Sequence, residues 1–186
     1  MSFKRRMNQK TDYVQRLGLL KSGKPRLVIR RSLNNVHIQL ITTDDGDKTI
    51  VETFSRNLRK YGWKGHCGNI SAAYLTGYLA GLNAKKHNIK DAVADIGLHT
   101  SVRGSRIYAA ILGAKDAGIV ISIGKEALPK MERINGKHIA DYAAKLKPNQ
   151  EKYKKQFSEY IKKGLNPEEL PKHFEEVKKN IENQVK

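Results

Sequence analysis

The stretch KPRLVIRRS at Lys24–Ser32, followed by NN at residues 34–35 and VHIQLI at Val36–Ile41, predicts two β-strands joined by a short polar turn. A third run, TIVETFS at Thr49–Ser55, follows the polar segment DDGD at residues 44–47. β-Branched residues dominate these runs and clusters of Asn, Asp and Gly separate them, which is typical of antiparallel hairpins. We therefore expect three consecutive antiparallel strands.

Alternation along these strands predicts the character of each sheet face, because successive side chains point to opposite faces. One parity is apolar and is expected to be buried against helices: Leu27, Ile29, Ile38, Leu40, Ile50 and Phe54. The other parity carries cations, an imidazole, an amide and hydroxyls: Arg26, Arg30, Ser32, His37, Gln39, Thr53 and Ser55. A slip of one residue would bring the arginines into the core, so the register is well specified. The sequence predicts a sheet with one polar, cationic face.

The charge of the chain points to a polyanionic partner. Its 186 residues include 36 Lys and Arg against 18 Asp and Glu, a formal net charge of +18. Such an excess makes nucleic acid the first candidate partner and an anionic membrane the second. No apolar run approaches the roughly 20 residues of a spanning helix, and the N-terminus lacks the apolar segment of a signal peptide. The single cysteine, Cys67, fits a reducing compartment, so we expect the cytoplasm.

Residues 1–24 are predicted to form a basic arm. This segment contains one acidic residue, Asp12, and seven cationic residues: Lys4, Arg5, Arg6, Lys10, Arg16, Lys21 and Lys24. A disordered, solvated tail is one interpretation. The other is an arm that becomes ordered on RNA, with Tyr13 stacking on a base while the cations neutralise phosphates.

The glycine-broken segment 56–69 is predicted to be an exposed basic loop, in which Trp63 and Lys64 approach a phosphate backbone. His66 next to Cys67 could suggest a metal. Two adjacent residues without a second pair elsewhere do not make a zinc site, so we expect none.

Helical and strand patterns alternate in the middle of the chain. The clearest helix is expected over Ile70–Asn83, capped by Asn69 or Ser71, with small residues every four positions packing on a sheet. Strands are expected at 92–97 and 119–124, and a second helix at Ile107–Ala117 with Gly118 at its C′ position. This order predicts parallel crossovers and an α/β fold.

Hydroxyls, a glycine and two arginines, Arg103 and Arg106, precede the second helix and form a weak, generic anion-site pattern. No phosphate-cradling GxxxxGK[ST] motif occurs in the sequence. Nucleotide hydrolysis is therefore disfavoured.

The composition changes from about residue 145. An amphipathic helix is expected over 149–163, and a later helix begins near Asn166-Pro167, although Pro171 leaves its start open between two positions. Its inner stripe is Phe174, Val177 and Ile181. The tail is predicted to be a packing or docking appendage, and a solvated helical face is the alternative.

Several of these segments together resemble a known family: Thr11–Tyr13, Ser22–Val28, Arg30–Ser32, Arg103–Ala110 and Asp116–Gly118. The family is the large-subunit ribosomal protein that binds 5S ribosomal RNA, numbered eighteen in bacteria and five in eukaryotes. The chain length and the C-terminal helices resemble the archaeal form. The resemblance implies a three-layer α/β fold of ribonuclease-H-like topology, divided into an arm (1–24), a central domain (25–145) and a helical extension (146–186).

The resemblance also implies the function. The arm and the polar sheet face would hold 5S rRNA and help attach it to the large-subunit rRNA in the central protuberance, beside neighbouring ribosomal proteins and without a cofactor, metal or membrane. RNA contacts are expected at Arg5, Arg6, Lys10, Tyr13, Arg16, Lys21, Lys24, Arg26, Arg30, Ser32, His37, Gln39, Trp63, Lys64, Arg103 and Arg106. His66-Cys67 stands where the family would have small residues, which affects only the local loop contact.

The main alternative is a ribonuclease-H-like, metal-dependent nuclease. Such an enzyme needs several carboxylates converging on divalent metal. Asp91, Asp95 and Asp116 are available, but Arg30 and His37 occupy the expected strand positions and would repel Mg²⁺. A membrane-surface protein is less consistent, because the cations lie on a strand face and an arm rather than on an amphipathic basic helix.

Overall fold

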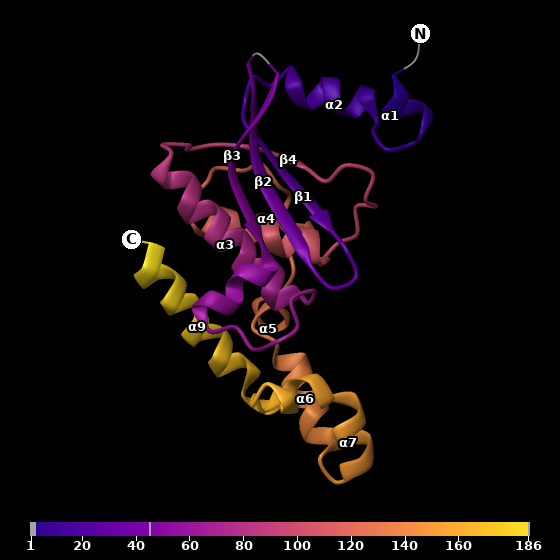
Figure 1. Cartoon of the computed structure of the whole chain (residues 1–186), viewed down its shortest axis with the longest axis vertical. Coiled ribbons are helices and arrows are strands. Elements are labelled where there is room, and N and C mark those ends of the chain that lie inside the picture. Colours follow the sequence, from indigo (N-terminus) through magenta and orange to yellow (C-terminus); the bar gives the residue numbers. More distant parts are fainter. Residues whose placement is uncertain (1–2, 45, 186) are drawn as a thin grey trace.

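The protein is built around a four-stranded mixed sheet, and the computed structural model describes residues 3–44 and 46–185 (Figure 1). The strands are β1 (Arg26–Arg31), β2 (Val36–Thr43), β3 (Asp47–Phe54) and β4 (Val93–Asp95), in the order β3-β2-β1-β4. β1, β2 and β3 pair antiparallel, whereas β4 runs parallel to β1. Ile29 lies opposite Ile38 in the predicted register. The antiparallel strands and the mixed α/β fold are confirmed.

The third strand faces the opposite way from the prediction. Thr53 pairs with Ile38 and shares its buried face, while Phe54 lies on the polar face. Ser55 is also buried, and its Oγ accepts a hydrogen bond of 3.0 Å from the first backbone N–H of β2. Ile50 is only half-buried, beside a register shift in the β2–β3 pairing. Pairing with β2 therefore overrides the hydrophobic parity of this strand. It buries the Ser55 hydroxyl with a hydrogen-bond partner and the Thr53 hydroxyl without one.

Two long helices, α3 (Ile70–Lys86) and α4 (Arg106–Asp116), cover the apolar face of the sheet. The predicted first helix is confirmed, and the side chain of its N-cap Asn69 accepts a hydrogen bond of 2.7 Å from Ala72 N. Its small residues face α4 rather than the sheet, which corrects the expectation. A Cβ added to Gly77 would lie 1.9 Å from the Ala110 carbonyl oxygen, so the two helix backbones touch.

The expected strand at 119–124 is wrong. Only an isolated parallel bridge joins Val120 to Asp91 there, and Val120 is exposed. Gly118 does terminate α4 at the predicted C′ position, with a φ of +104°. The chain then continues through a 3₁₀ turn, η2 (Lys125–Ala127), into α5 (Met131–Ile134).

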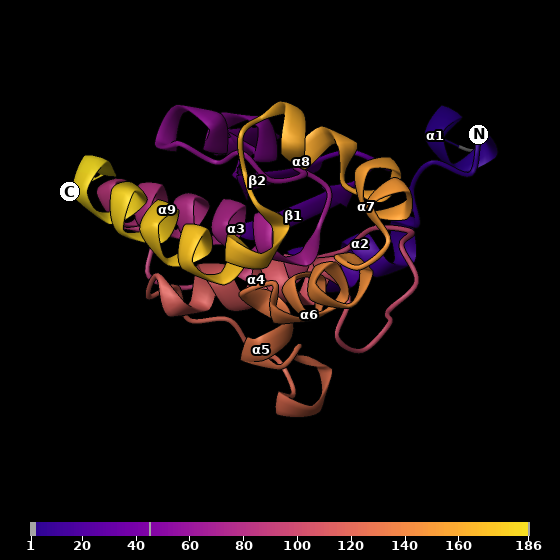
Figure 2. The ribbon, with the colours of Figure 1, turned by 90° about the horizontal axis from the view of Figure 1, so that it is seen from below.

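The C-terminal helices form a separate lobe that is anchored to the body by the last helix (Figures 1 and 2). α6 (Lys137–Leu146), α7 (Gln150–Gln156) and α8 (Ser158–Lys162) project from one end, so the expected helix over 149–163 is broken at Phe157. A 3₁₀ turn, η3 (Pro167–Glu169), leads into α9 (Leu170–Val185), where Pro171 occupies the first turn and is tolerated. α9 packs against α3, and the stripe predicted for it, Phe174, Val177 and Ile181, is buried.

The arm contains two short helices, α1 (Lys4–Met7) and α2 (Tyr13–Leu20), and lies at the other end of the sheet from the C-terminal lobe (Figure 1). Asp12 caps α2 by accepting hydrogen bonds from Val14 N and Gln15 N. Among the described residues, no helix has the length and apolar character needed to cross a bilayer.

Candidate nucleic-acid interface

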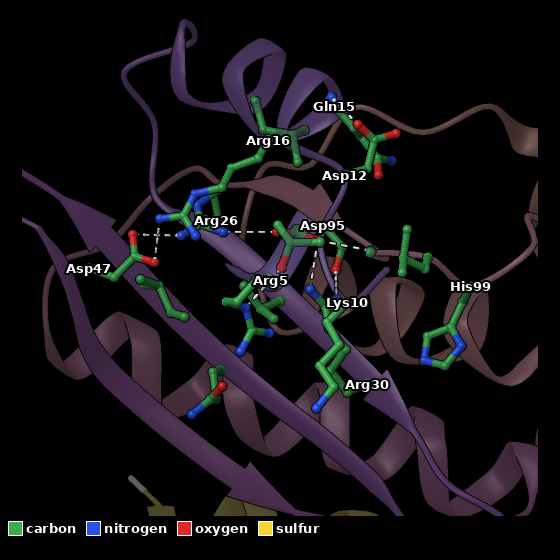
Figure 3. Close-up of a pocket in the computed structure, with 17 residues that line it drawn as sticks. Arg5, Lys10, Asp12, Gln15, Arg16, Arg26, Arg30, Asp47, Asp95 and His99 are labelled. Carbon is green, nitrogen blue, oxygen red and sulfur yellow. Dashed lines mark hydrogen bonds and ion pairs between the residues drawn. The ribbon is translucent and has the colours of Figure 1, made fainter. Parts of the chain in front are cut away.

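A groove of about 620 Å³ separates the arm from the polar face of the sheet (Figure 3). Its walls come from α2 and the preceding turn, from β1 and β2, and from the segment after β4. Five cationic side chains line it together with three carboxylates: Arg5, Lys10, Arg16, Arg26 and Arg30, with Asp12, Asp47 and Asp95. The groove thus brings together predicted contact residues from the arm and from the sheet.

The arm is held over the sheet by Asp47, the first residue of β3. Asp47 binds Arg16 of α2 through Oδ2 and Arg26 of β1 through Oδ1, both at 2.8 Å. Partial burial raises the pKa of Asp47, but hydrogen bonds from Thr43 and Arg26 and the charges of Arg26 and Arg16 outweigh it and lower the pKa below the usual value. The carboxylate therefore stays ionised and keeps both arginines in place.

Arg26 does not lie on an open cationic face as expected. Its side chain is only 5% exposed, and its Nη1 donates a 2.8 Å hydrogen bond to Asp95 Oδ2 while Nη2 binds Asp47 (Figure 3). A buried guanidinium needs such partners because an unpaired buried charge is costly. The structure therefore makes Arg26 the support of the groove floor, with its charge already compensated.

Arg30 is the sheet cation that reaches solvent in the groove. It donates to Asp95 Oδ1 at 3.0 Å and to the Asp95 carbonyl at 2.9 Å, but its side chain remains 42% exposed. His99 lies at the same end, where its Nε2 accepts a hydrogen bond from Arg31 N. Burial, with the charges of nearby arginines, lowers the pKa of His99, so the imidazole is neutral at pH 7.

The three carboxylates that the nuclease alternative would use each bind a different set of side chains. Asp95 serves two arginines, Asp91 binds Lys24 at 2.8 Å, and Asp116 accepts a 2.7 Å hydrogen bond from the Tyr74 hydroxyl. Within residues 3–44 and 46–185, no group of three or more His, Cys, Asp or Glu side chains could hold a metal ion. The three carboxylates thus bind different partners and are not gathered at one point, as a two-metal site would require.

The basic loop differs from its prediction. Trp63 is 2% exposed and stacks on His173 of α9 at 5.3 Å, so the expected exposure of its ring is wrong. The reason is non-local, because the covering helix comes more than a hundred residues later. Lys64 is exposed, whereas the segment before it forms a 3₁₀ helix, η1 (Ser55–Tyr61), rather than an open loop.

The remaining predicted contacts differ in exposure and in role. Exposed positions on the arm, on the β1–β2 turn and near α4 are Arg6, Lys21, Lys24, Ser32 and Arg103. Tyr13 is half-buried and stacks on Phe3 at 4.7 Å. Arg106 instead ties the fold together, since its Nη1 donates to the carbonyls of Gly68, Ser32 and Leu33.

Sequence reasoning missed a second hollow, of about 360 Å³, at the other end of the polar face. It contains Phe54 and Arg56, which no motif singled out. The sequence signal was Phe54 at the end of a strand, two residues before Arg56, but parity placed that ring in the core. A further hollow of about 370 Å³ lies next to the C-terminal lobe and includes Arg56, Arg59 and Lys163.

The fold and its cationic grooves fit the class of nucleic-acid-binding α/β proteins. Residues 1–94 match the family described as "Ribosomal large subunit proteins 60S L5, and 50S L18". The chain is also 54% identical over 182 residues to large ribosomal subunit protein uL18 of Methanococcus maripaludis, across 97% of this chain and 94% of that protein. The chain belongs to the uL18 family of large-subunit ribosomal proteins, in its archaeal form. It is a structural component of the cytoplasmic ribosome, with ribosomal RNA and ribosomal proteins as partners, and not an enzyme.

Proposed function

We propose that the chain binds 5S rRNA through the groove between arm and sheet, and helps attach it to the large-subunit rRNA in the central protuberance. The observation that carries this proposal is the convergence of arm and sheet cations on one groove, where arginines already engage the carboxylates of Asp47 and Asp95. Neutralising phosphates with such cations releases counterions, which supplies most of the affinity for nucleic acid.

Within this proposal the predicted contacts have two roles. Arg5, Lys10 and Arg30 touch phosphates, since they line the groove and are not buried. Arg16 and Arg26 position the arm and the groove floor through Asp47 and Asp95. Phosphate contacts fix orientation without reading sequence, so recognition of this particular RNA rests on shape and on unpaired bases.

Attachment of one RNA to another requires a second RNA-facing surface. The hollow beside the C-terminal lobe supports this role, because it brings together Asn34, Arg59, His66 and Lys163 from three distant segments. It lies on the β1–β2 turn, η1 and α8, away from the arm. We assign the large-subunit rRNA to this surface.

The topology proposed for the domain is ribonuclease-H-like. The antiparallel order of β1, β2 and β3, followed by β4 parallel to β1, supports it. The parallel bridge between Asp91 and Val120 stands where a further strand would continue the sheet. The groove lies on the polar face of this sheet, with α3 and α4 on the opposite face.

A filter-binding titration against 5S rRNA, with transfer RNA as competitor, tests the proposal. We expect 5S rRNA to be retained under a large excess of transfer RNA. The double variant Arg5→Gln/Lys10→Gln should bind more weakly, and the slope of log K against log salt should fall by about 0.7–0.9 for each lost contact. The control Lys172→Gln/Lys179→Gln removes the same charge from exposed positions on α9 and should keep the wild-type slope. Equal competition by transfer RNA would contradict the proposal.

A further inference from the structure

Two aromatic rings form a stack on the polar face of the sheet, where the sequence predicts only polar groups. His37 of β2 and Phe54 of β3 are direct cross-strand partners. Their ring centroids lie 3.8 Å apart and their planes differ by 8°. Phe54 belongs to an edge strand and is 39% exposed, so the stack is open to solvent.

The imidazole of this stack is held in place by the side chain of Glu52 on the neighbouring strand. His37 Nε2 lies 2.7 Å from Glu52 Oε1, and the same oxygen accepts a hydrogen bond from Gln39 at 3.1 Å. Glu52 and Gln39 are cross-strand partners next to the stack. The rings are therefore oriented before any ligand arrives, which reduces the entropy that binding would cost.

The stack lines the hollow of about 360 Å³, and cations surround it. Arg30 and Arg31 come from the end of β1, and Arg56 comes from the start of η1. Ser32 and Asn35 of the β1–β2 turn complete the wall and offer hydrogen-bonding groups. The volume lies within the range of about 300–1,000 Å³ that is typical of small-ligand sites. Flat rings in a hollow that is also lined by arginines match the chemistry of a nucleotide, whose base is flat and whose phosphates are anionic.

We propose that this hollow binds a single unpaired nucleotide of the RNA, with its base stacked on the His37–Phe54 pair and its flanking phosphates on Arg31 and Arg56. The inference rests on the proposed function and deepens it. A paired base cannot reach the rings, because A-form helices keep their bases stacked inside. An extruded base can, and any base presents a π-face to an aromatic platform. The site therefore adds a non-ionic contribution to a binding surface that is otherwise electrostatic.

Two substitutions of Phe54 test the site in the full-length protein. Phe54→Leu keeps an apolar side chain but removes the π-face, and should weaken binding of 5S rRNA by about 5- to 150-fold, the range of one base–aromatic stack. The slope of log K against log salt should stay at the wild-type value, since no phosphate contact is lost. Phe54→Trp keeps an aromatic ring at this position and should bind 5S rRNA with an affinity close to that of the wild type. Tyr142→Leu, which changes an exposed aromatic residue of α6, is the matched control and should bind like wild type.

A fluorescence measurement makes the test independent of 5S rRNA. The natural Trp63 is buried, so quenching of the Phe54→Trp variant by single-stranded oligouridylate reports on position 54. Quenching by the single strand, and none by an RNA duplex of the same length, would support the site. The site would be overturned if Phe54→Leu bound 5S rRNA and oligouridylate with wild-type affinity. It would also be overturned if duplex and single strand quenched the Phe54→Trp variant alike. If oligouridylate quenched the Phe54→Trp variant but the protein did not prefer 5S rRNA over transfer RNA, the proposed function would be contradicted and the nucleotide site would still be supported.

Discussion

Arg26 and Asp95 form an ion pair beneath the groove, with Nη1 and Oδ2 2.8 Å apart and side chains only 5% and 8% exposed. The same carboxylate holds Arg30, and the same guanidinium holds Asp47. The pair therefore links the floor of the groove to its rim and, through Asp47, to the arm. One residue of β4 thus determines how β1 presents two of its arginines to the groove.

Asp95→Asn should lower the free energy of unfolding by about 3–5 kcal/mol, because it leaves the buried Arg26 short of one anionic partner and frees Arg30. Urea denaturation measures this loss. Asp116→Asn is the control, since its carboxylate makes a single hydrogen bond to Tyr74, and its removal should cost about 1 kcal/mol. Equal losses in the two variants would show that the Arg26–Asp95 pair does not stabilise the fold.

The arm contact should depend on pH through Asp47. Its pKa is lower in the folded state than the unperturbed 3.8, so its contribution to stability is present above that value and is lost as pH falls through the folded pKa. Asp47→Asn should be less stable than wild type near pH 6, by no more than about 1 kcal/mol, because the Asp47 side chain is 33% exposed and solvent screens its charge. The difference should vanish in acid, below both pKa values. A difference that persisted there would assign the effect to packing rather than to charge.

The sequence predicted the parts of the fold that depend on local pattern. The β1–β2 register, α3 with its Asn69 cap and the glycine after α4 all follow from neighbouring residues, and the structure has them. The resemblance to the ribosomal family, carried by short motifs, also agreed with the comparisons.

The errors have non-local causes. Phe54 faces outward because β2 sets the register of β3, and Trp63 is buried because α9 returns to cover it. Arg26 was assigned correctly to the polar face, but two acids from β3 and β4 make it a buried support. A pattern within one segment cannot reveal which distant carboxylate neutralises a cation or which distant helix covers a ring.

The contact between α3 and α4 should be intolerant of a single methyl group. Gly77→Ala would place a Cβ 1.9 Å from the Ala110 carbonyl oxygen, so the helices must separate, at a cost of about 3 kcal/mol or more. Gly18→Ala is the control, because position 18 of α2 has no atom within 4 Å and alanine favours the helix. The melting temperature should fall strongly in Gly77→Ala and should not fall in Gly18→Ala. Similar melting temperatures would mean that the helices can move apart freely.

Deleting residues 1–22 should weaken RNA binding while leaving the fold intact. α1 and α2 contain no buried residue, and the deletion removes the exposed Arg16–Asp47 pair, worth about 1 kcal/mol or less. The loss of arm cations should flatten the dependence of log K on log salt. Filter binding across a salt series and a melting curve give the two readouts. An unchanged slope would rule out phosphate contacts by the arm.

The C-terminal extension, proposed to begin at residue 146, should prove inseparable from the core. Phe174 of α9 is fully buried and packs on Tyr74 of α3 with ring centroids 5.6 Å apart. Phe174→Ala should therefore lower the free energy of unfolding by about 3–5 kcal/mol, through lost burial and a cavity. Ile161→Ala, on the exposed surface of α8, should change it by less than about 0.5 kcal/mol. Urea denaturation of both variants, followed by a probe of the sheet, decides the matter. If Phe174→Ala melted the C-terminal helices but left the sheet transition at its wild-type midpoint, the extension would be an independent unit that merely rests on α3.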